Sequence, residues 1–467
     1  MEKGQISSRV TITSLPSHVL LDVFDFYRLL LWNQWDEVWK WQTLAHVCSR
    51  WRQIVFESPR RLDLRLTCTG RKIVREMLDA FPNFPININY QHNPQSLHDT
   101  REYLNNILAA LECRGQARRI SLTGRLNPLL KTLVTRMQEP FPALTSLELM
   151  SNDGVETAPV IPDTFLGRSA PSLQSLNLGG ISFPGLPNLL FSARDLVSLK
   201  LTQIPISPEA LADNLSALPR LTSFILHSAT SHSDRTIRRP PPLTGTIVPS
   251  LTSFTFYGAI KYLEDLVAPI SAPLLEFAAI NLDQPSFVTP QLFRFLSRSE
   301  ILKSLKRLGI RFEQNLIQIA SFPSATTPRP GYLTLRVVCQ ESAWRVTLAA
   351  QLCSQSSPLF SEVEKLEING IGGYQSIRQD HINQIQWLEV FRPFTAVQKL
   401  HISDYMMPLF LPALRGLAEE EAKELLPALH SLVFTLLQPN EYMSDVIRSF
   451  STARRFFGRP VGVYFWN

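Results

Sequence analysis

The chain contains 467 residues, of which 45% are hydrophobic and 18% are charged. This length exceeds what one compact core holds, so we expect several domains or one extended array, and the hydrophobic content excludes a wholly disordered chain. The most apolar stretch, 19–32, contains Asp22, Asp25 and Arg28, so we expect no membrane span. The chain has 46 basic and 40 acidic residues but no concentrated basic patch, which argues against nucleic acid as a partner.

The first predicted element is a helix that follows a segment, 1–12, which we expect to be flexible. Leu15 and Pro16 open it, and proline is tolerated there because its missing N–H would be unpaired in any case. Its apolar positions at helical spacing are Val19, Leu20, Val23, Phe24 and Tyr27. A second helical stretch is expected to present one apolar stripe, formed by Leu44, Val47, Trp51, Ile54 and Val55. So small a module buries too little surface to be stable alone, so we expect it to dock on a partner or a neighbouring domain.

These two stretches contain a recognisable pattern, Leu15-Pro16, Val19-Leu20-Leu21 and Val23-Phe24, then Val47-Cys48-Ser49-Arg50-Trp51-Arg52. The pattern resembles an F-box, and the continuation at 56–64 is similar to that of fungal F-box families. The resemblance implies a three-helix module over 13–58 that binds the Skp-type adaptor of a cullin-RING ubiquitin ligase. The residues that it implies for adaptor binding, some facing the adaptor and some the module's own core, are Leu15, Pro16, Val19, Leu20, Val23, Phe24, Leu44, Val47, Cys48 and Trp51.

The rest of the chain repeats the pattern L-x-x-L-x-L with conservative exchanges. Copies recur about every 28 residues, close to the period of leucine-rich repeats. They occupy 117–122, 144–149, 173–178, 196–201, 221–226, 251–256, 274–279, 305–310, 332–337, 363–368, 397–402 and 429–434. A proline lies two residues before the first leucine at Pro142, Pro171, Pro219, Pro249 and Pro427. Proline suits the start of a strand, where a missing hydrogen-bond donor is tolerated.

Each copy is expected to supply one short parallel strand whose second and third leucines point into the core, followed by a helix or turn that returns the chain. The expected helices are 208–218, 290–297 and 414–426, the expected loops are 227–249 and 323–330, and the expected final strand is 461–465. The predicted fold class is α/β: a small N-terminal three-helix F-box followed, over 59–467, by a divergent leucine-rich-repeat-like α/β solenoid, or horseshoe.

Residues that alternate with the inward leucines should face the concave side of the solenoid. They mix both signs of charge with polar and apolar groups, which suits a protein or peptide ligand and argues against one uniform polyanion. The candidate target-binding residues are Glu148, Asn177, Lys200, Thr255, Arg311, Arg336, Glu367 and His401, together with Ile225 and Val433.

The search for catalytic chemistry finds no phosphate-binding glycine loop, no H-E-x-x-H and no G-x-S-x-G. The five cysteines show neither C-x-x-C nor metal-ligand spacing, and no apolar signal segment is apparent after Met1. We therefore expect no catalytic residue, cofactor or metal site, and reduced thiols in an intracellular protein of the cytoplasm, the nucleus or both.

The function predicted from this organisation is recognition. The chain is expected to act as a substrate-recognition subunit of an SCF-type cullin-RING ubiquitin ligase, with the F-box on the adaptor and the repeats on a target protein. The alternative is a leucine-rich-repeat scaffold that acts outside ubiquitination, and an enzyme on an unusual framework is a distant third.

Overall fold

A computed structural model of the chain defines its fold. It describes residues 12–30, 41–58, 66–69, 74–80, 84–91, 100–125, 127–152, 158–228, 245–283, 289–322, 331–339, 345–370, 384–418, 424–435 and 440–466. Contacts divide the chain into two compact units, Met1–Leu173 and Gln174–Asn467. Both combine helices with strands, which confirms the α/β class. Within the described residues, no helix is long and apolar enough to cross a membrane.

The first unit begins with helical elements, which are η1 (Ile12–Ser14), α1 (Ser17–Leu30), α2 (Trp41–Val47) and α3 (Ser49–Glu57). The prediction of one continuous apolar stripe over residues 44–55 is wrong, because the chain breaks at Cys48. This residue is extended, with φ −159° and ψ 169°, and its sulfur accepts the N–H of Trp51 at 3.4 Å. Cys48 therefore caps α3, and the break turns α3 away from the course of α2.

The remainder of the first unit alternates strands and helices. Its strands are β1 (Leu66–Cys68), β2 (Ile86–Gln91), β3 (Ala117–Gly124) and β4 (Ser146–Ser151), and its helices are α4 (Val74–Ala80), α5 (Thr100–Glu112), α6 (Asn127–Arg136) and the short η2 (Phe165–Arg168). Consecutive strands from β1 to β4 pair in parallel. The repeat copies at 117–122 and 144–149 form β3 and β4, while β1 and β2 precede the first copy found in the sequence.

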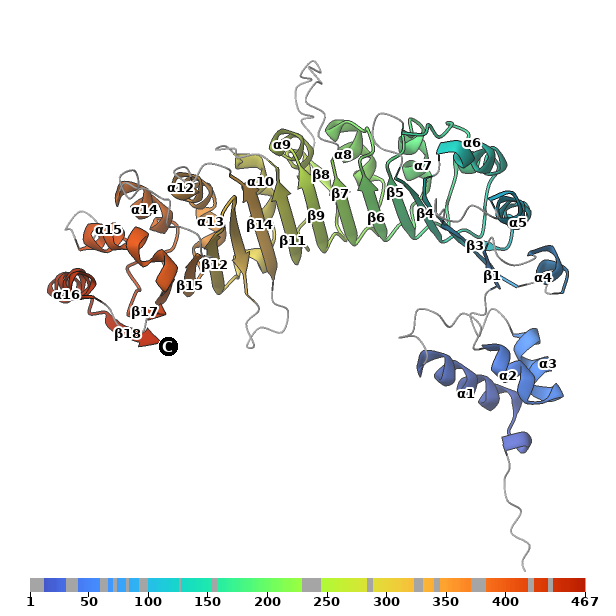
Figure 1. Cartoon of the computed structure of the whole chain (residues 1–467), viewed down its shortest axis with the longest axis horizontal. Helices are drawn as coiled ribbons and strands as arrows, with labels where there is room; N and C mark the ends of the chain where they lie inside the picture. The colour runs from blue at the N-terminus through green and yellow to red at the C-terminus, as the bar shows by residue number, and fades with distance from the viewer. Residues whose placement is uncertain are drawn as a thin grey trace, which may run out of the picture. The chain divides into compact units, whose positions relative to one another are not determined.

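The second unit starts with a run of parallel strands, β5 (Ser175–Gly179), β6 (Ser198–Thr202), β7 (Ser223–His227), β9 (Ser253–Gly258) and β11 (Phe277–Leu282). The segments between and after them hold α7 (Leu186–Ser192), α8 (Pro208–Ser216), α9 (Ile260–Val267), α10 (Pro290–Leu296) and α11 (Glu300–Lys303). Figure 1 shows these helices along one face of the sheet. The predicted inward leucines are buried, as Leu199 and Leu201 illustrate, and the predicted helices 208–218 and 290–297 are confirmed as α8 and α10.

The expected loop at 227–249 is only partly correct. Residues 229–244 lie outside the described part of the chain, but β8 (Thr246–Ile247) pairs in parallel with β10 (Ile270–Ser271). The second expected loop, 323–330, lies outside the described residues as well.

The prediction that every copy stacks in sequence order is wrong between β11 and β15 (Lys365–Gly370). Three strands lie between these two in space, β12 (Arg307–Phe312), β13 (Leu316–Ser321) and β14 (Tyr332–Val338), and their spatial order is β11-β14-β13-β12-β15. β13 matches no copy of the repeat and pairs antiparallel with both β12 and β14. Residues 313–315 are too few for the crossover that a parallel neighbour requires, so the chain turns back as a hairpin.

The end of the second unit returns to parallel pairing along β15, β16 (Lys399–Ser403), β17 (Ser431–Thr435) and β18 (Gly462–Trp466). Its helical elements are α12 (Arg345–Gln355), α13 (Ser357–Phe360), α14 (Gln384–Phe391), η6 (Asp404–Met406), α15 (Met407–Leu417) and α16 (Glu441–Phe456). The expected final strand is confirmed as β18. The expected helix 414–426 is wrong, because α15 begins and ends earlier, and residues 419–423 lie outside the described part.

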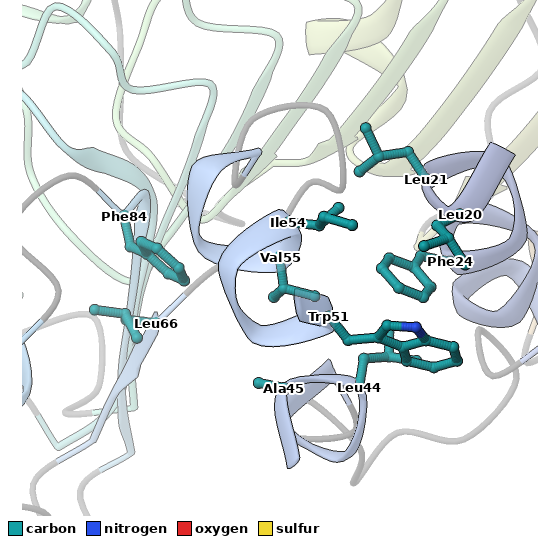
Figure 2. Close-up of a cluster of buried hydrophobic side chains, with 10 residues drawn as sticks. All are labelled: Leu20, Leu21, Phe24, Leu44, Ala45, Trp51, Ile54, Val55, Leu66 and Phe84. Atoms are coloured by element: carbon teal, nitrogen blue, oxygen red, sulfur yellow. The ribbon is translucent and has the colours of Figure 1, made fainter. Parts of the chain in front are cut away.

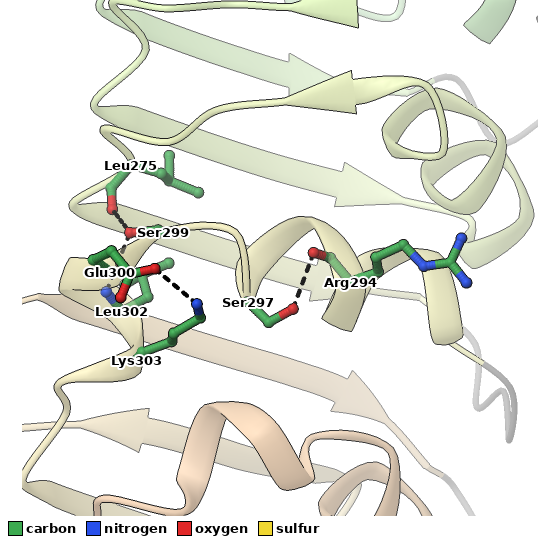
Figure 3. Close-up of polar contacts among 7 residues, drawn as sticks. All are labelled: Leu275, Arg294, Ser297, Ser299, Glu300, Leu302 and Lys303. Atoms are coloured by element: carbon green, nitrogen blue, oxygen red, sulfur yellow. Dashed lines mark hydrogen bonds and ion pairs between the residues drawn. The ribbon is translucent and has the colours of Figure 1, made fainter. Parts of the chain in front are cut away.

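Buried serines join the helix layer to the strands, and Ser299 is the clearest case (Figure 3). Its side chain donates to the carbonyl of Leu275 at 2.6 Å and accepts the N–H of Leu302 at 3.2 Å. It thus caps α11 and satisfies the carbonyl of a residue just before β11.

We expect Ser299→Ala to lower the free energy of unfolding of the second unit by about 1–3 kcal/mol, because it removes a cap and leaves a buried carbonyl without its donor. Ser297→Ala is the matched control, since Ser297 is half-buried at the C-cap of α10 and its hydroxyl donates to the carbonyl of Arg294 one turn earlier. Urea unfolding of the two variants measures the difference, and equal midpoints would contradict the assigned role of Ser299.

Candidate interaction surfaces

The N-terminal helices enclose an aromatic core of their own (Figure 2). Leu20 and Phe24 of α1 and Trp51 of α3 are buried, and the rings of Phe24 and Trp51 meet edge to face with centroids 4.8 Å apart. Leu44 of α2 belongs to the same cluster. The resemblance implied that some of the listed residues face the module's own core, and these four lie there.

The same cluster extends to the first strands of the unit. Leu66 of β1 and Phe84, just before β2, are buried in it with Val55 of α3. Phe56 and Phe84 also meet edge to face, with ring centroids 6.0 Å apart. One side of α3 is therefore committed to packing on the strands that follow, so any partner of this module must use its other surfaces.

A second group of apolar side chains in this module remains exposed. Val23 and Phe26 of α1 are 41% and 65% exposed, and Val47 at the end of α2 is 58% exposed. Val19, Val23 and Phe26 are spaced by four and three residues, so they form one line along α1. Phe26 was not among the residues predicted from the sequence, although its spacing from Val19 could have indicated it.

The remaining predicted residues of the module lie at its margin. Pro16 is exposed, whereas Leu15 and Cys48 are partly buried against the cluster. The guanidinium of Arg50 donates to the carbonyl of Leu15 at 2.6 Å, and that of Arg52 donates to the carbonyl of Ala45 at 3.0 Å. These bonds fix the segment that carries Pro16 against α3 and tie α2 to α3.

The candidate target-binding residues occupy the face of the strands that alternates with the buried leucines. In the second unit, Asn177, Lys200, Ile225 and Thr255 lie side by side on four neighbouring strands. Glu148 is in the first unit, where it accepts a hydrogen bond from Ser121 at 2.8 Å. Val433 is wrong as a surface residue, because only 7% of it is exposed.

Glu367 and His401 pair across β15 and β16, and both already have partners. Lys365 lies 2.7 Å from the Glu367 carboxylate and Arg307 lies 3.5 Å from it. Burial alone would raise the pKa of Glu367, but Lys365, His401 and Arg307 together bring it below its usual value. Burial lowers the pKa of His401, whose Nε2 is 2.7 Å from the hydroxyl of Thr435, so this ring is largely neutral near pH 7.

Arg311 and Arg336 do not share a row with Glu367 and His401. The antiparallel strands place Arg311 opposite Gln318 and Arg336 on the other side of the same glutamine. The two arginines come from repeat copies that were expected to be direct neighbours, so the inserted strand β13 sets their separation.

Possible metal ligands are scattered in the described part of the chain. No three His, Cys, Asp or Glu side chains there could share a metal ion. Burial, with a contribution from Cys113, raises the pKa of Cys68 to about 12, and burial also raises that of Cys353. Neither thiol is thus activated as a nucleophile.

Comparison with known proteins identifies no relative: no model of a protein family matches the chain, and no curated protein matches it.

Proposed function

We propose that the chain is a substrate-recognition subunit of an SCF-type cullin-RING ubiquitin ligase, with an F-box at 13–58 and a leucine-rich-repeat-like solenoid after it. The observation that carries the proposal is the division of apolar side chains in the N-terminal helices. Phe24 and Trp51 form the core, while Val23, Phe26 and Val47 remain exposed. Exposed apolar side chains in line on one helix are typical of a surface that a partner covers.

The second part of the proposal concerns the strands. A mostly parallel sheet with helices along one face leaves its other face open in the second unit (Figure 1). Polar and charged residues from consecutive strands line that face, among them Lys200, Thr255 and Arg336. The F-box would hold the adaptor and this face would hold a target, and catalysis would come from raising the target's effective concentration near a ubiquitin-loaded enzyme.

The test is a pull-down of purified Skp-type adaptor with the full chain. Burying a valine and a phenylalanine contributes roughly 1.5–3 kcal/mol each, so Val23→Ala/Phe26→Ala should weaken adaptor binding by about a hundredfold or more. Val160→Ala/Phe191→Ala is the matched control, because these residues are exposed outside the module. It should retain the adaptor at the wild-type level.

Two outcomes would redirect the proposal. If the wild-type chain captures no adaptor, the F-box assignment fails. If it captures adaptor but no cullin, and no protein is stabilised when the chain is removed from cells, the scaffold function is favoured. The open face of the sheet serves recognition under both functions.

A further inference from the structure

The open face of the second unit's sheet is cationic. This face consists of the residues on strands β5 to β18 that alternate with the inward, buried residues of each strand. Among the described residues of these strands, its only acidic side chain is Glu367, and its basic side chains are Lys200, Arg307, Arg311, Arg336, Lys365 and Lys399. Because Glu367 is already paired with Lys365 and Arg307, the remaining positive charge is available to a ligand.

Two of these cations lie in one polar row across neighbouring strands. We call it the arginine row, and it consists of Tyr257, Asn281, Arg336, Gln318, Arg311 and Asn369. Within the described part of the chain, neither guanidinium makes a hydrogen bond or an ion pair, and both side chains reach solvent. Since β13 separates their strands, the two backbones are about 10 Å apart.

An aromatic pair lies on the same face, two rows away from the arginine row, because Phe277 and Tyr332 precede Asn281 and Arg336 by four residues on their strands. The rings of Phe277 on β11 and Tyr332 on β14 stack with centroids 4.7 Å apart and an interplanar angle of 8°. Both are exposed, as is Tyr257, whose ring meets that of His227 edge to face at 4.3 Å. Exposed aromatic side chains beside arginines are the residues that most often anchor a protein ligand.

We propose that the arginine row binds an acidic, extended peptide segment of a partner protein. Arg336 and Arg311 would each take one carboxylate, and Tyr257, at the end of the row, would take an apolar side chain. Carboxylates two or three residues apart in an extended peptide span about 7–10 Å, which fits the separation of the two arginines. A guanidinium holds a carboxylate through two parallel hydrogen bonds, so each contact is strong and directional.

The arrangement favours a peptide over a nucleic acid. A nucleic acid backbone needs cations along a continuous path, whereas here Glu367 is paired with two of the cations and Gln318 separates the two free arginines. Asn281, Gln318 and Asn369 offer both donors and acceptors, which suit peptide groups. The identification of the segment as part of a ubiquitination target rests on the proposed function, but its binding to the row does not.

The test uses the full chain without adaptor and a fluorescent peptide that carries two glutamates about three residues apart, with a phenylalanine about three residues further along on each side. Arg311→Ala/Arg336→Ala should weaken binding by about tenfold or more, since each arginine makes a charge-assisted contact. Arg392→Ala/Arg448→Ala removes the same charge from exposed residues outside the strands and should leave binding unchanged. Glu367→Gln should tighten binding, because it releases Lys365 and Arg307.

Three results would overturn the proposal: equal binding of the peptide with every glutamate replaced by glutamine, no effect of the arginine substitutions, or tighter binding of a single-stranded oligonucleotide at the same salt concentration. Tyr257→Ala should weaken peptide binding without abolishing its salt dependence, and Tyr442→Ala on α16 is its control. Adaptor capture is measured separately, so a failure of peptide binding leaves the F-box assignment standing, and a failure of adaptor capture leaves the arginine row standing.

Discussion

Phe24→Ala is expected to unfold the N-terminal helices, residues 17–57, while the second unit stays folded. Phe24 is 1% exposed and packs edge to face on Trp51. Removing a buried phenylalanine costs about 3–5 kcal/mol. A module of this size has little stability in reserve, so a loss of this size should unfold it. Hydrogen exchange followed by mass spectrometry should show α1 and α3 losing protection together.

Phe26→Ala is the matched control. Phe26 is two residues away on the same helix and 65% exposed, so its removal should leave the exchange of α1 unchanged. Under the proposed function, both variants lose the adaptor, but only Phe24→Ala loses the fold. If Phe26→Ala unfolded the helices as well, or if Phe24→Ala left them protected, the separation of core from exposed residues in this module would be incorrect.

The periodicity of apolar residues was sufficient to predict the helices and strands that are determined by their own local sequence. The leucine spacing predicted the parallel strands β5, β6 and β7, because each strand repeats the same alternation of buried and open residues. The helix α8 was predicted from Pro208 at its first turn and the apolar residues after it. In the N-terminal helices, the apolar pattern located α1 and placed Phe24 in its apolar stripe. It could not show that Val23 of the same stripe stays exposed, because only packing decides this.

The order of strands β12, β13 and β14 could not be predicted from the repeat, because the repeat specifies which residues of a strand are buried but not which strand lies beside it. A local signal was nevertheless present. The segment 316–321 alternates buried and half-buried residues, with Ile317 and Ile319 inward, and it follows β12 after only three residues. Recognising this hairpin would have separated Arg311 from Arg336 by one strand and predicted the arginine row.

Trp387→Ala is expected to be the most destabilising single substitution in the second unit. Trp387 of α14 is fully buried, and its ring centroid lies 5.8 Å from that of Phe312 on β12, 5.6 Å from that of Phe410 on α15 and 6.2 Å from that of Phe391. It therefore joins the sheet to two helices. Loss of the side chain should lower the free energy of unfolding by about 3–5 kcal/mol through the cavity and the lost ring contacts.

Two further substitutions make this prediction specific. The indole N–H of Trp387 has no hydrogen-bond acceptor among the described residues, so Trp387→Phe keeps most of the packing, loses no hydrogen bond and should cost less than half as much as alanine. Trp466→Ala removes the same side chain from a 70% exposed position on β18 and should shift thermal unfolding little. Equal shifts for Trp387→Ala and Trp466→Ala would contradict the central position of Trp387. A loss in Trp387→Phe as large as that in Trp387→Ala would contradict the conclusion that the indole N–H forms no hydrogen bond.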